Sequence, residues 1–266
     1  MRNIFQVVQL LRFHRGEIMK SYFRSLNIKL GNFFFQFRNG LFPIVVILLM
    51  GLTRPHMTLN EGKVFKWLIP SIGVILCLMG EGIRLLTIGF KYIDRGGRNN
   101  HLFASRLVTD GIYKHVRNPM YLGNLLIVFG FSFYTGSPMF FVIAVSFFII
   151  SYQSIMAAEK DYLMRQFGEE YSSYCQTVNS LWPSFRGLSK TLSTITFSWK
   201  RCLRKDYGTI TTLALILISL SLWKTYFLHK SMTIKIIPGT VIEILIATIL
   251  YIGVRKLKKT GRLADA

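Results

Sequence analysis

Six apolar blocks constrain the fold of this chain more than any other feature of its sequence. A helix needs about 20 apolar residues to cross the hydrocarbon core of a bilayer, and a chain in lipid must satisfy its backbone hydrogen bonds internally. The last four blocks are therefore predicted to be helices. The expected fold class is an all-α, polytopic integral membrane protein with about 5–6 transmembrane helices. The blocks lie near residues 41–52, 67–90, 121–134, 138–158, 208–228 and 236–254.

The first two blocks contain residues that need separate explanations. The first is short and contains Pro43, and it reaches spanning length only if residues 31–37 join it, with Arg38 snorkelling to the interface. In the second block, Glu81 and Arg84 lie three residues apart on one helix face. We expect them to form a structural pair near the cytoplasmic end, with Arg84 snorkelling.

The charge distribution predicts the topology. With six spans and a cytoplasmic N-terminus, 26 of the 33 Lys and Arg residues lie on the cytoplasmic side and six on the other. The positive-inside rule therefore predicts that both termini are cytoplasmic. This basic face could also hold anionic lipid headgroups, each nearby cation contributing about 1 kcal/mol. A nucleic-acid partner is not expected, because that would need a soluble basic fold.

Cysteine and histidine spacing argues against a metal centre. The three cysteines, Cys77, Cys175 and Cys202, are far apart, which also argues against a disulfide framework. The five histidines show no metal-ligand spacing. No metal is therefore expected.

An apolar hairpin brings two polar segments to the same side of the membrane. Pro119 suits the first turn of a helix, which is predicted to run to about Tyr134, and 135–138 forms a turn. The return helix is predicted over 138–158. Arg117, Asn118 and Tyr121 then lie at one foot and Glu159 at the other, and both feet are cytoplasmic.

The side chains at these feet have complementary chemistry. Arg117 could clamp a carboxylate, and Asn118 could donate or accept a hydrogen bond. Tyr113 and Tyr121 could offer aromatic faces to a cationic centre, while Glu159 could accept hydrogen bonds from a ribose or an amine. Each residue taken alone is more simply an interfacial anchor. Their gathering at both feet of one hairpin favours a binding site.

Two sequence motifs around this hairpin resemble the isoprenylcysteine carboxyl methyltransferases and the related phospholipid methyltransferases. The family pattern Leu-Val-x-x-Gly-x-Tyr matches residues 107–113, and Arg-His/Asn-Pro-x-Tyr-x-Gly matches 117–123. A Glu, then Phe-Gly, then Tyr-x-x-Tyr follow over residues 159–174. The resemblance covers roughly residues 75–183. The order and spacing of two separate motifs make it more specific than either motif alone.

The resemblance implies S-adenosylmethionine as the methyl donor, held on the cytoplasmic side, and an acceptor that enters from the membrane. It also implies a site in which Arg117 and Glu159 are the candidate catalytic residues. Glu159 is the candidate base if the acceptor is an amine, and a cofactor contact if it is a carboxylate. The implied cofactor-binding residues are Ser105, Arg106, Leu107, Val108, Tyr113, Asn118, Pro119, Met120, Tyr121 and Glu159.

Three positions depart from the family pattern. Asn118 replaces a His of the eukaryotic members, which indicates a bacterial-type member and hence a bacterial inner membrane. Lys160 replaces a second Glu. Ile155 stands where the prenylcysteine enzymes carry an Arg that contacts the acceptor carboxylate. The departures at Lys160 and Ile155 concern the acceptor rather than the donor.

The expected organisation follows from the blocks and the resemblance. A basic amphipathic segment is followed by transmembrane helices 1 and 2, a methyltransferase core with the cofactor motif, hairpin and cytoplasmic helix, a basic linker, and two C-terminal transmembrane helices. The predicted bounds of these five parts are 1–38, 39–90, 91–186, 187–206 and 207–266.

The expected function is a membrane-embedded, S-adenosylmethionine-dependent methyltransferase. Its acceptor would be a lipid or lipidated group, either an isoprenylcysteine-like carboxyl or a phospholipid amine. One alternative is a sterol-type membrane reductase that uses NADPH, because those enzymes share an Arg-x-Pro-x-Tyr-x-Gly helix start. A second alternative is a transporter or scaffold, although the chain shows no internal repeat of the kind common in transporters.

Overall fold

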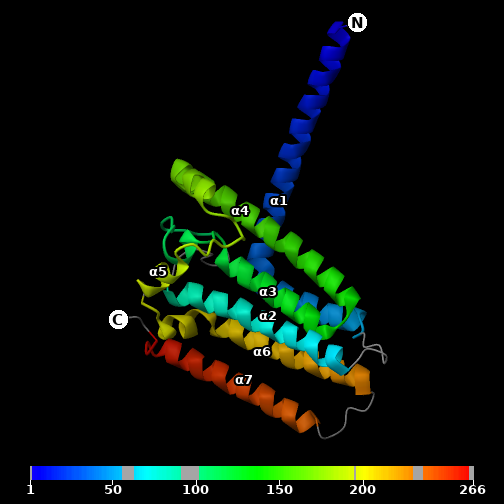
Figure 1. The fold of residues 1–266 in the computed structure, drawn as a ribbon, viewed down its shortest axis with the longest axis vertical. Helices are drawn as coiled ribbons and strands as arrows, with labels where there is room; N and C mark the ends of the chain where they lie inside the picture. The colour runs from blue at the N-terminus through cyan, green and yellow to red at the C-terminus, as the bar shows by residue number, and fades with distance from the viewer. Residues whose placement is uncertain (1, 56–62, 91–101, 195, 230–235, 264–266) are drawn as a thin grey trace.

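The computed structural model describes residues 2–55, 63–90, 102–194, 196–229 and 236–263. Every regular element in these ranges is a helix (Figure 1), which confirms the predicted all-α fold class. The elements are α1 (Arg2–Leu52), α2 (Lys63–Phe90), the 3₁₀ helix η1 (Gly111–Lys114), α3 (Pro119–Thr135), α4 (Pro138–Thr177), α5 (Leu188–Ser193), α6 (Trp199–His229) and α7 (Ile236–Lys259).

Four described segments are long and apolar enough to cross a membrane, and they support an integral, multi-pass protein. α3 is apolar but shorter, at 17 residues, and forms one arm of the predicted hairpin. Many apolar side chains on these helices are exposed, as expected where lipid is the surrounding solvent. The four segments are Glu17–Leu52, Trp67–Phe90, Pro138–Thr177 and Trp199–Phe227.

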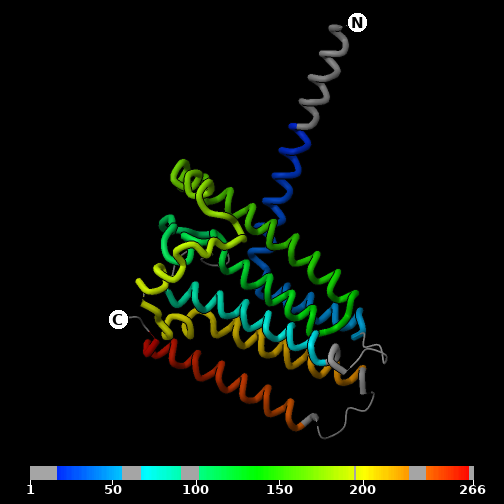
Figure 2. Tube along the Cα trace, in the orientation of Figure 1, coloured from blue at the N-terminus to red at the C-terminus, as the bar shows by residue number. Residues whose placement is uncertain are grey.

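Two predicted boundaries do not coincide with the ends of helices. α1 continues through position 38 and includes Pro43, so residues 31–37 and the first apolar block form one helix. The N-terminal end of the part of α1 that is coloured in Figure 2 projects beyond the other helices, while the C-terminal part of α1 packs on α4. The predicted linker 187–206 contains α5 and the first turns of α6, which begins at Trp199.

Helices α2 and α3 pack unusually closely because glycines face each other across their contact. A Cβ atom at Gly80 would lie 2.5 Å from the carbonyl oxygen of Gly123, and one at Gly130 would lie 2.6 Å from that of Gly73. Cys77, between the two α2 glycines, donates to the Ile127 carbonyl at 3.6 Å. Small residues at such spacing let helix backbones approach in a membrane, where packing drives association. This contact fixes the position of α3 along α2.

The hairpin between α3 and α4 forms as predicted. Gly136 takes the left-handed conformation (φ 65°) that ends α3, and the Ser137 hydroxyl caps α4 by accepting from the Phe140 N–H at 3.3 Å. Pro138 occupies the first helical position. α4 then runs well past Glu159 and bends at Gly168, whose backbone is non-helical (φ 50°, ψ −120°). The two feet therefore return to the same end of the helices.

Candidate functional site

A cavity of about 740 Å³ opens among the helices at this end of the molecule. Its walls come from α1, α2, α3, α4, α6 and α7, with Tyr113 from η1. The volume lies within the range of about 300–1,000 Å³ typical of small-molecule sites. The cavity therefore has room for a cofactor or part of an amphiphilic ligand.

The structure brings the residues predicted at the two feet of the hairpin to this one cavity. Its lining includes the whole segment 117–121, together with Tyr113 and Glu159. Glu159 is buried, with 7% of its surface exposed. Tyr121 packs against Tyr152 of α4 at 5.7 Å between ring centroids, which ties the two arms together beside the cavity.

Residues 179 and 180, which follow α4 and are called the strap below, hold residues 117 and 118 in front of α3. The N–H groups of Arg117 and Asn118 donate to the carbonyls of Asn179 (2.9 Å) and Ser180 (3.1 Å). The Asn118 side-chain amide also donates to the Ser180 hydroxyl at 2.9 Å. Because polar backbone groups here have partners outside any helix, residues 117 and 118 are fixed in place before α3 begins. Nothing in the local sequence signals this strap.

Two buried side chains support the same segment from behind. The Tyr174 hydroxyl donates to the Tyr113 carbonyl at 2.6 Å. The His115 ring makes hydrogen bonds to the Ser184 carbonyl (2.8 Å) and the Thr191 hydroxyl (2.9 Å). The second tyrosine of the Tyr-x-x-Tyr motif, Tyr174, thus positions the backbone at Tyr113. His115 anchors the segment 184–191, which follows the strap.

Arg117 is suited to bind an anionic group. One terminal nitrogen contacts the sulfur of Cys175, whereas the buried Nε has no hydrogen-bond partner among the described residues. The positive end of α3 starts two residues later, at Pro119. Backbone dipole and guanidinium therefore favour negative charge at the same point.

The four residues predicted from the motif at 105–108 lie outside the cavity lining. Ser105 and Arg106 are exposed to solvent. Leu107 packs on a cluster that includes Leu163 and Tyr171, and Val108 packs directly on Tyr113. Val108 therefore contacts the cavity only indirectly, through Tyr113, which lines it.

Two of the three residues that depart from the family pattern lie off the cavity, whereas the third, Asn118, lines it. Lys160 is exposed, while Ile155 is fully buried in the main apolar core. Neither side chain lines the cavity, so Lys160 does not place its charge beside a ligand bound there.

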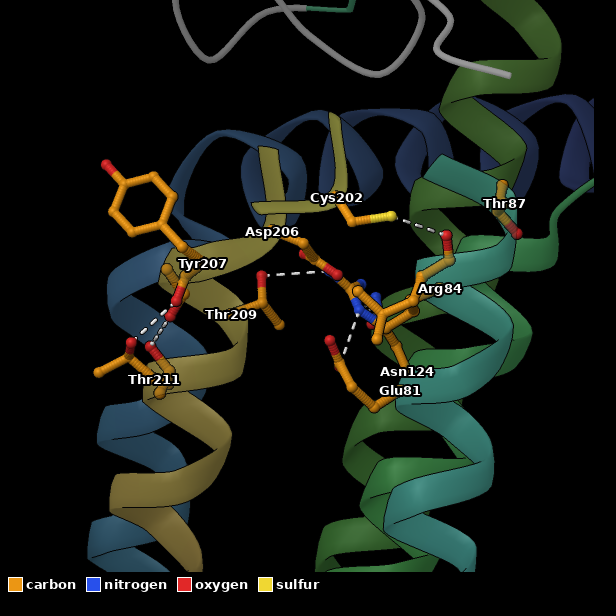
Figure 3. Close-up of polar contacts among 12 residues, drawn as sticks. Glu81, Arg84, Thr87, Asn124, Cys202, Asp206, Tyr207, Thr209 and Thr211 are labelled. Carbon is orange, nitrogen blue, oxygen red and sulfur yellow. Dashed lines mark hydrogen bonds and ion pairs between the residues drawn. The ribbon is translucent and has the colours of Figure 1, made fainter. Parts of the chain in front are cut away.

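The structure adds a charged group that sequence reasoning described only in part. Arg84 pairs with Glu81, as predicted, with 3.3 Å between Nε and Oε2. The predicted snorkelling is wrong, because Arg84 is only 6% exposed and turns inward to Asp206 of α6 (Figure 3). The ion pair with Asp206 holds the Arg84 side chain in this position. Because Asp206 lies 122 residues further along the chain, the local sequence around Arg84 does not indicate the pair. Arg84 and Asp206 both line the cavity.

Arg38, which was predicted to reach the interface, also lines the cavity. Its guanidinium lies 4.2 Å from the centroid of the Phe35 ring, a cation–π contact on its own helix. Lys205 and Tyr207 of α6 and Tyr251 of α7 complete this side. The sequence positions of Arg38, Lys205, Tyr207 and Tyr251 gave no indication that these residues line one cavity. Among the described residues, no group of three or more His, Cys, Asp or Glu side chains could hold a metal ion.

Comparisons with known proteins place the hairpin in a recognised family region. Residues 69–170 match the family described as phospholipid methyltransferase. The chain is 29% identical over 122 residues to protein-S-isoprenylcysteine O-methyltransferase B of Arabidopsis thaliana, covering 43% of this chain and 59% of that protein. It is 26% identical over 164 residues to the protein-S-isoprenylcysteine O-methyltransferase of Schizosaccharomyces pombe, covering 46% and 68%.

A bacterial relative matches more of the chain. The cobalt-zinc-cadmium resistance protein CzcN of Cupriavidus metallidurans is 28% identical over 170 residues, covering 63% of this chain and 74% of its own. Against several plant relatives the chain spans about three fifths of their length. No solved structure matches the chain significantly.

Proposed function

Because the chain belongs to the family of phospholipid and isoprenylcysteine methyltransferases, we propose that it is a membrane-embedded methyltransferase that uses S-adenosylmethionine. Its acceptor is a lipid or a lipidated group that reaches the cavity from the bilayer. One observation carries this proposal. The family region contains both feet of the hairpin, and both feet line one cavity.

The residues at the mouth of the cavity fit this cofactor. S-adenosylmethionine supplies a methyl group already activated on a cationic sulfonium. Arg117, with its unpartnered Nε, would hold the carboxylate, helped by the N-terminus of α3. The Tyr113 and Tyr121 rings would face the sulfonium, and Glu159 would accept from the ribose or the amino group. Val108 would support this mouth from outside through Tyr113.

The protein's contribution to the reaction is alignment and exclusion of water. Holding donor and acceptor at near-attack distance can supply about 7–11 kcal/mol in favourable cases. The segment 117–121 is held by backbone hydrogen bonds and by packing, so little motion is needed to orient a ligand. If the acceptor carries a proton that must leave, Glu159 at the mouth can accept it.

The charge pattern supports a cytoplasmic mouth. The basic residues predicted to be cytoplasmic include Arg117 and Lys205, which line the cavity. Both termini would lie on that side, in a bacterial inner membrane, and the basic face would attract anionic headgroups. The NADPH-reductase alternative is not favoured, because the family region and the named relatives are those of methyltransferases.

Binding and turnover together test the proposal. Purified protein in detergent should bind S-adenosylhomocysteine, and membranes containing it should transfer a methyl label from S-adenosylmethionine to lipid. Arg117→Ala and Glu159→Gln should each lower transfer about 100-fold or more while the protein stays inserted. Arg165→Ala and Asp161→Asn, which alter charges outside the cavity lining, are the matched controls. Binding of NADPH with no response to S-adenosylhomocysteine would overturn the proposal.

A further inference from the structure

The chain between α4 and α6 carries exposed aromatic side chains. Residues 181–194 and 196–201 are called the connecting segment below. Trp182 and Phe185 lie between α4 and α5, outside every helix, and Trp199 is the first residue of α6. Their side chains are 81%, 73% and 68% exposed. Single exposed apolar residues are ordinary, but aromatic rings gathered on one short connection indicate a surface that a partner covers.

The connecting segment is also basic. Arg186, Lys190 and Lys200 are all exposed to solvent. No Asp or Glu occurs in the sequence between Glu170 and Asp206. A stretch with cations and no carboxylate of its own attracts an anionic surface. Aromatic rings and positive charge therefore occur together in the connecting segment.

Hydrogen bonds and packing tie one end of the connecting segment to the end of a spanning helix. The Ser198 N–H donates to the Gly89 carbonyl at 3.0 Å, and Arg201 donates to the same carbonyl at 3.3 Å. The Phe197 ring packs on that of Phe90, the last residue of α2, at 5.2 Å between centroids. The segment therefore lies where a span ends, which is the depth that Trp, Lys and Arg side chains prefer in a membrane.

The other end of the connecting segment is tied to the cavity mouth. The strap, which holds the N–H groups of Arg117 and Asn118, directly precedes it. The Ser184 N–H donates to the His115 carbonyl at 2.9 Å, and the His115 ring bonds to the Ser184 carbonyl and the Thr191 hydroxyl. A contact that restrains the connecting segment therefore also restrains the wall of the mouth.

We propose that the connecting segment docks on the surface of an anionic lipid leaflet. Trp182 and Phe185 enter the headgroup region, and Arg186 and Lys190 pair with the lipid phosphates. This contact orders the segment, and the strap passes that order to the cavity mouth. Resting on the function proposed above, donor binding is then tighter in an anionic membrane than in a neutral one. The segment lies outside the matched region 69–170, so this lipid preference belongs to this chain.

A lipid surface fits the connecting segment better than a soluble acidic partner does. Both would match the charge. However, α5 and the start of α6 lie at the same end of the bundle as the start of α3 (Figure 1), and Trp199 opens a segment apolar enough to cross the membrane. The headgroups at that end of the spans are thus already beside the exposed rings.

Quenching of tryptophan fluorescence by brominated lipid tests the docking without reference to activity. The full chain is placed in nanodiscs of brominated phosphatidylcholine, with or without brominated phosphatidylglycerol. The signal of Trp182 is the difference between wild type and Trp182→Phe, because the chain has three other tryptophans. This signal should be more strongly quenched and blue-shifted in the anionic discs, and high salt should reduce the difference.

A matched pair of charge variants tests the coupling to the mouth. Arg186→Gln with Lys190→Gln removes two cations of the connecting segment, whereas Lys256→Gln with Lys259→Gln removes two exposed cations near the end of α7. Wild type should bind S-adenosylhomocysteine about 10-fold more tightly in anionic than in neutral discs. The first variant should lose most of this difference, and the α7 variant should keep it.

The outcomes separate this inference from the function on which its coupling rests. Equal quenching of Trp182 in both kinds of disc overturns the docking on an anionic leaflet. Equal losses in the two charge variants would show that the whole basic face attracts lipid, and the docking segment would be wrong. A wild-type affinity for S-adenosylhomocysteine that is the same in both discs overturns the coupling. If wild type binds no S-adenosylhomocysteine at all, the proposed function fails, and the quenching still decides the docking.

Discussion

The contact between α2 and α3 makes a quantitative prediction, because two glycines on one helix differ only in what they face. A Cβ at Gly80 would lie 2.5 Å from the Gly123 carbonyl oxygen and 2.9 Å from the Ile127 side chain. A Cβ at Gly82, two residues on, would meet nothing within 4 Å. Gly80→Ala and Gly82→Ala therefore form a matched pair.

The expected difference in stability between these two variants follows from the one respect in which they differ, the space around the added methyl group. Both substitutions gain the same helix propensity, so that contribution cancels in the comparison. At Gly80 the helices must separate by about 1 Å to restore van der Waals distance, because the opposing atom is backbone. Overpacking of this kind costs about 1–3 kcal/mol. Gly80→Ala should therefore be less stable than Gly82→Ala by about 1–3 kcal/mol.

Reversible unfolding of the purified variants in mixed detergent micelles measures this difference. Gly123→Ala should behave like Gly80→Ala, since its Cβ would lie 2.6 Å from the Gly80 carbonyl oxygen and 2.8 Å from Cγ of Arg84. It should also weaken methyl transfer, because displacing Arg84 disturbs the deeper part of the cavity. Equal stability of Gly80→Ala and Gly82→Ala would refute close packing of α2 on α3.

Three further changes test the supports of the cavity mouth. Tyr174→Phe removes a buried hydrogen bond to the Tyr113 carbonyl and should cost about 1–3 kcal/mol of unfolding free energy, with weaker binding of S-adenosylhomocysteine; wild-type values for both would contradict the 2.6 Å contact. Gly168→Ala should cost about 1–3 kcal/mol through backbone strain alone, whereas Gly253→Ala, in open space inside helix α7, should stabilise the protein by up to about 1 kcal/mol in the same unfolding assay. His115→Ala should speed limited proteolysis of the segment after α4, and an unchanged cleavage rate would show that its two hydrogen bonds do not hold that segment.

Sequence reasoning was most successful where lipid and local backbone chemistry leave few choices. Long apolar blocks must be helical in a bilayer, and Pro119, Gly136 and Pro138 mark the start of α3 and the turn into α4. The hairpin then requires Arg117 and Glu159 to share one end, and the structure places them on one cavity. The motif at residues 105–108 was less informative, because none of its four side chains lines the cavity.

The first helix shows a different limit of local patterns. Basic residues before position 38 suggested a separate amphipathic segment, yet α1 is continuous through Pro43. A proline within a helix removes one backbone hydrogen bond, and packing of α1 on α4 can compensate for that loss. Composition indicates where a helix prefers lipid or water, whereas its length depends on the partner that lies beside it.

The helical class, the hairpin and the polar mouth were thus readable from residue order, because each rests on interactions within a few turns of one chain segment. The inner face of the cavity was not. Asp206 looks like one charge at the start of an apolar run, and it gains a role only because α6 packs on α2 and presents it to Arg84. Pairing between charges 122 residues apart has no local signature. The polar mouth of the cavity was therefore foreseeable, while the charged group deeper in the cavity depended on how the helices assemble.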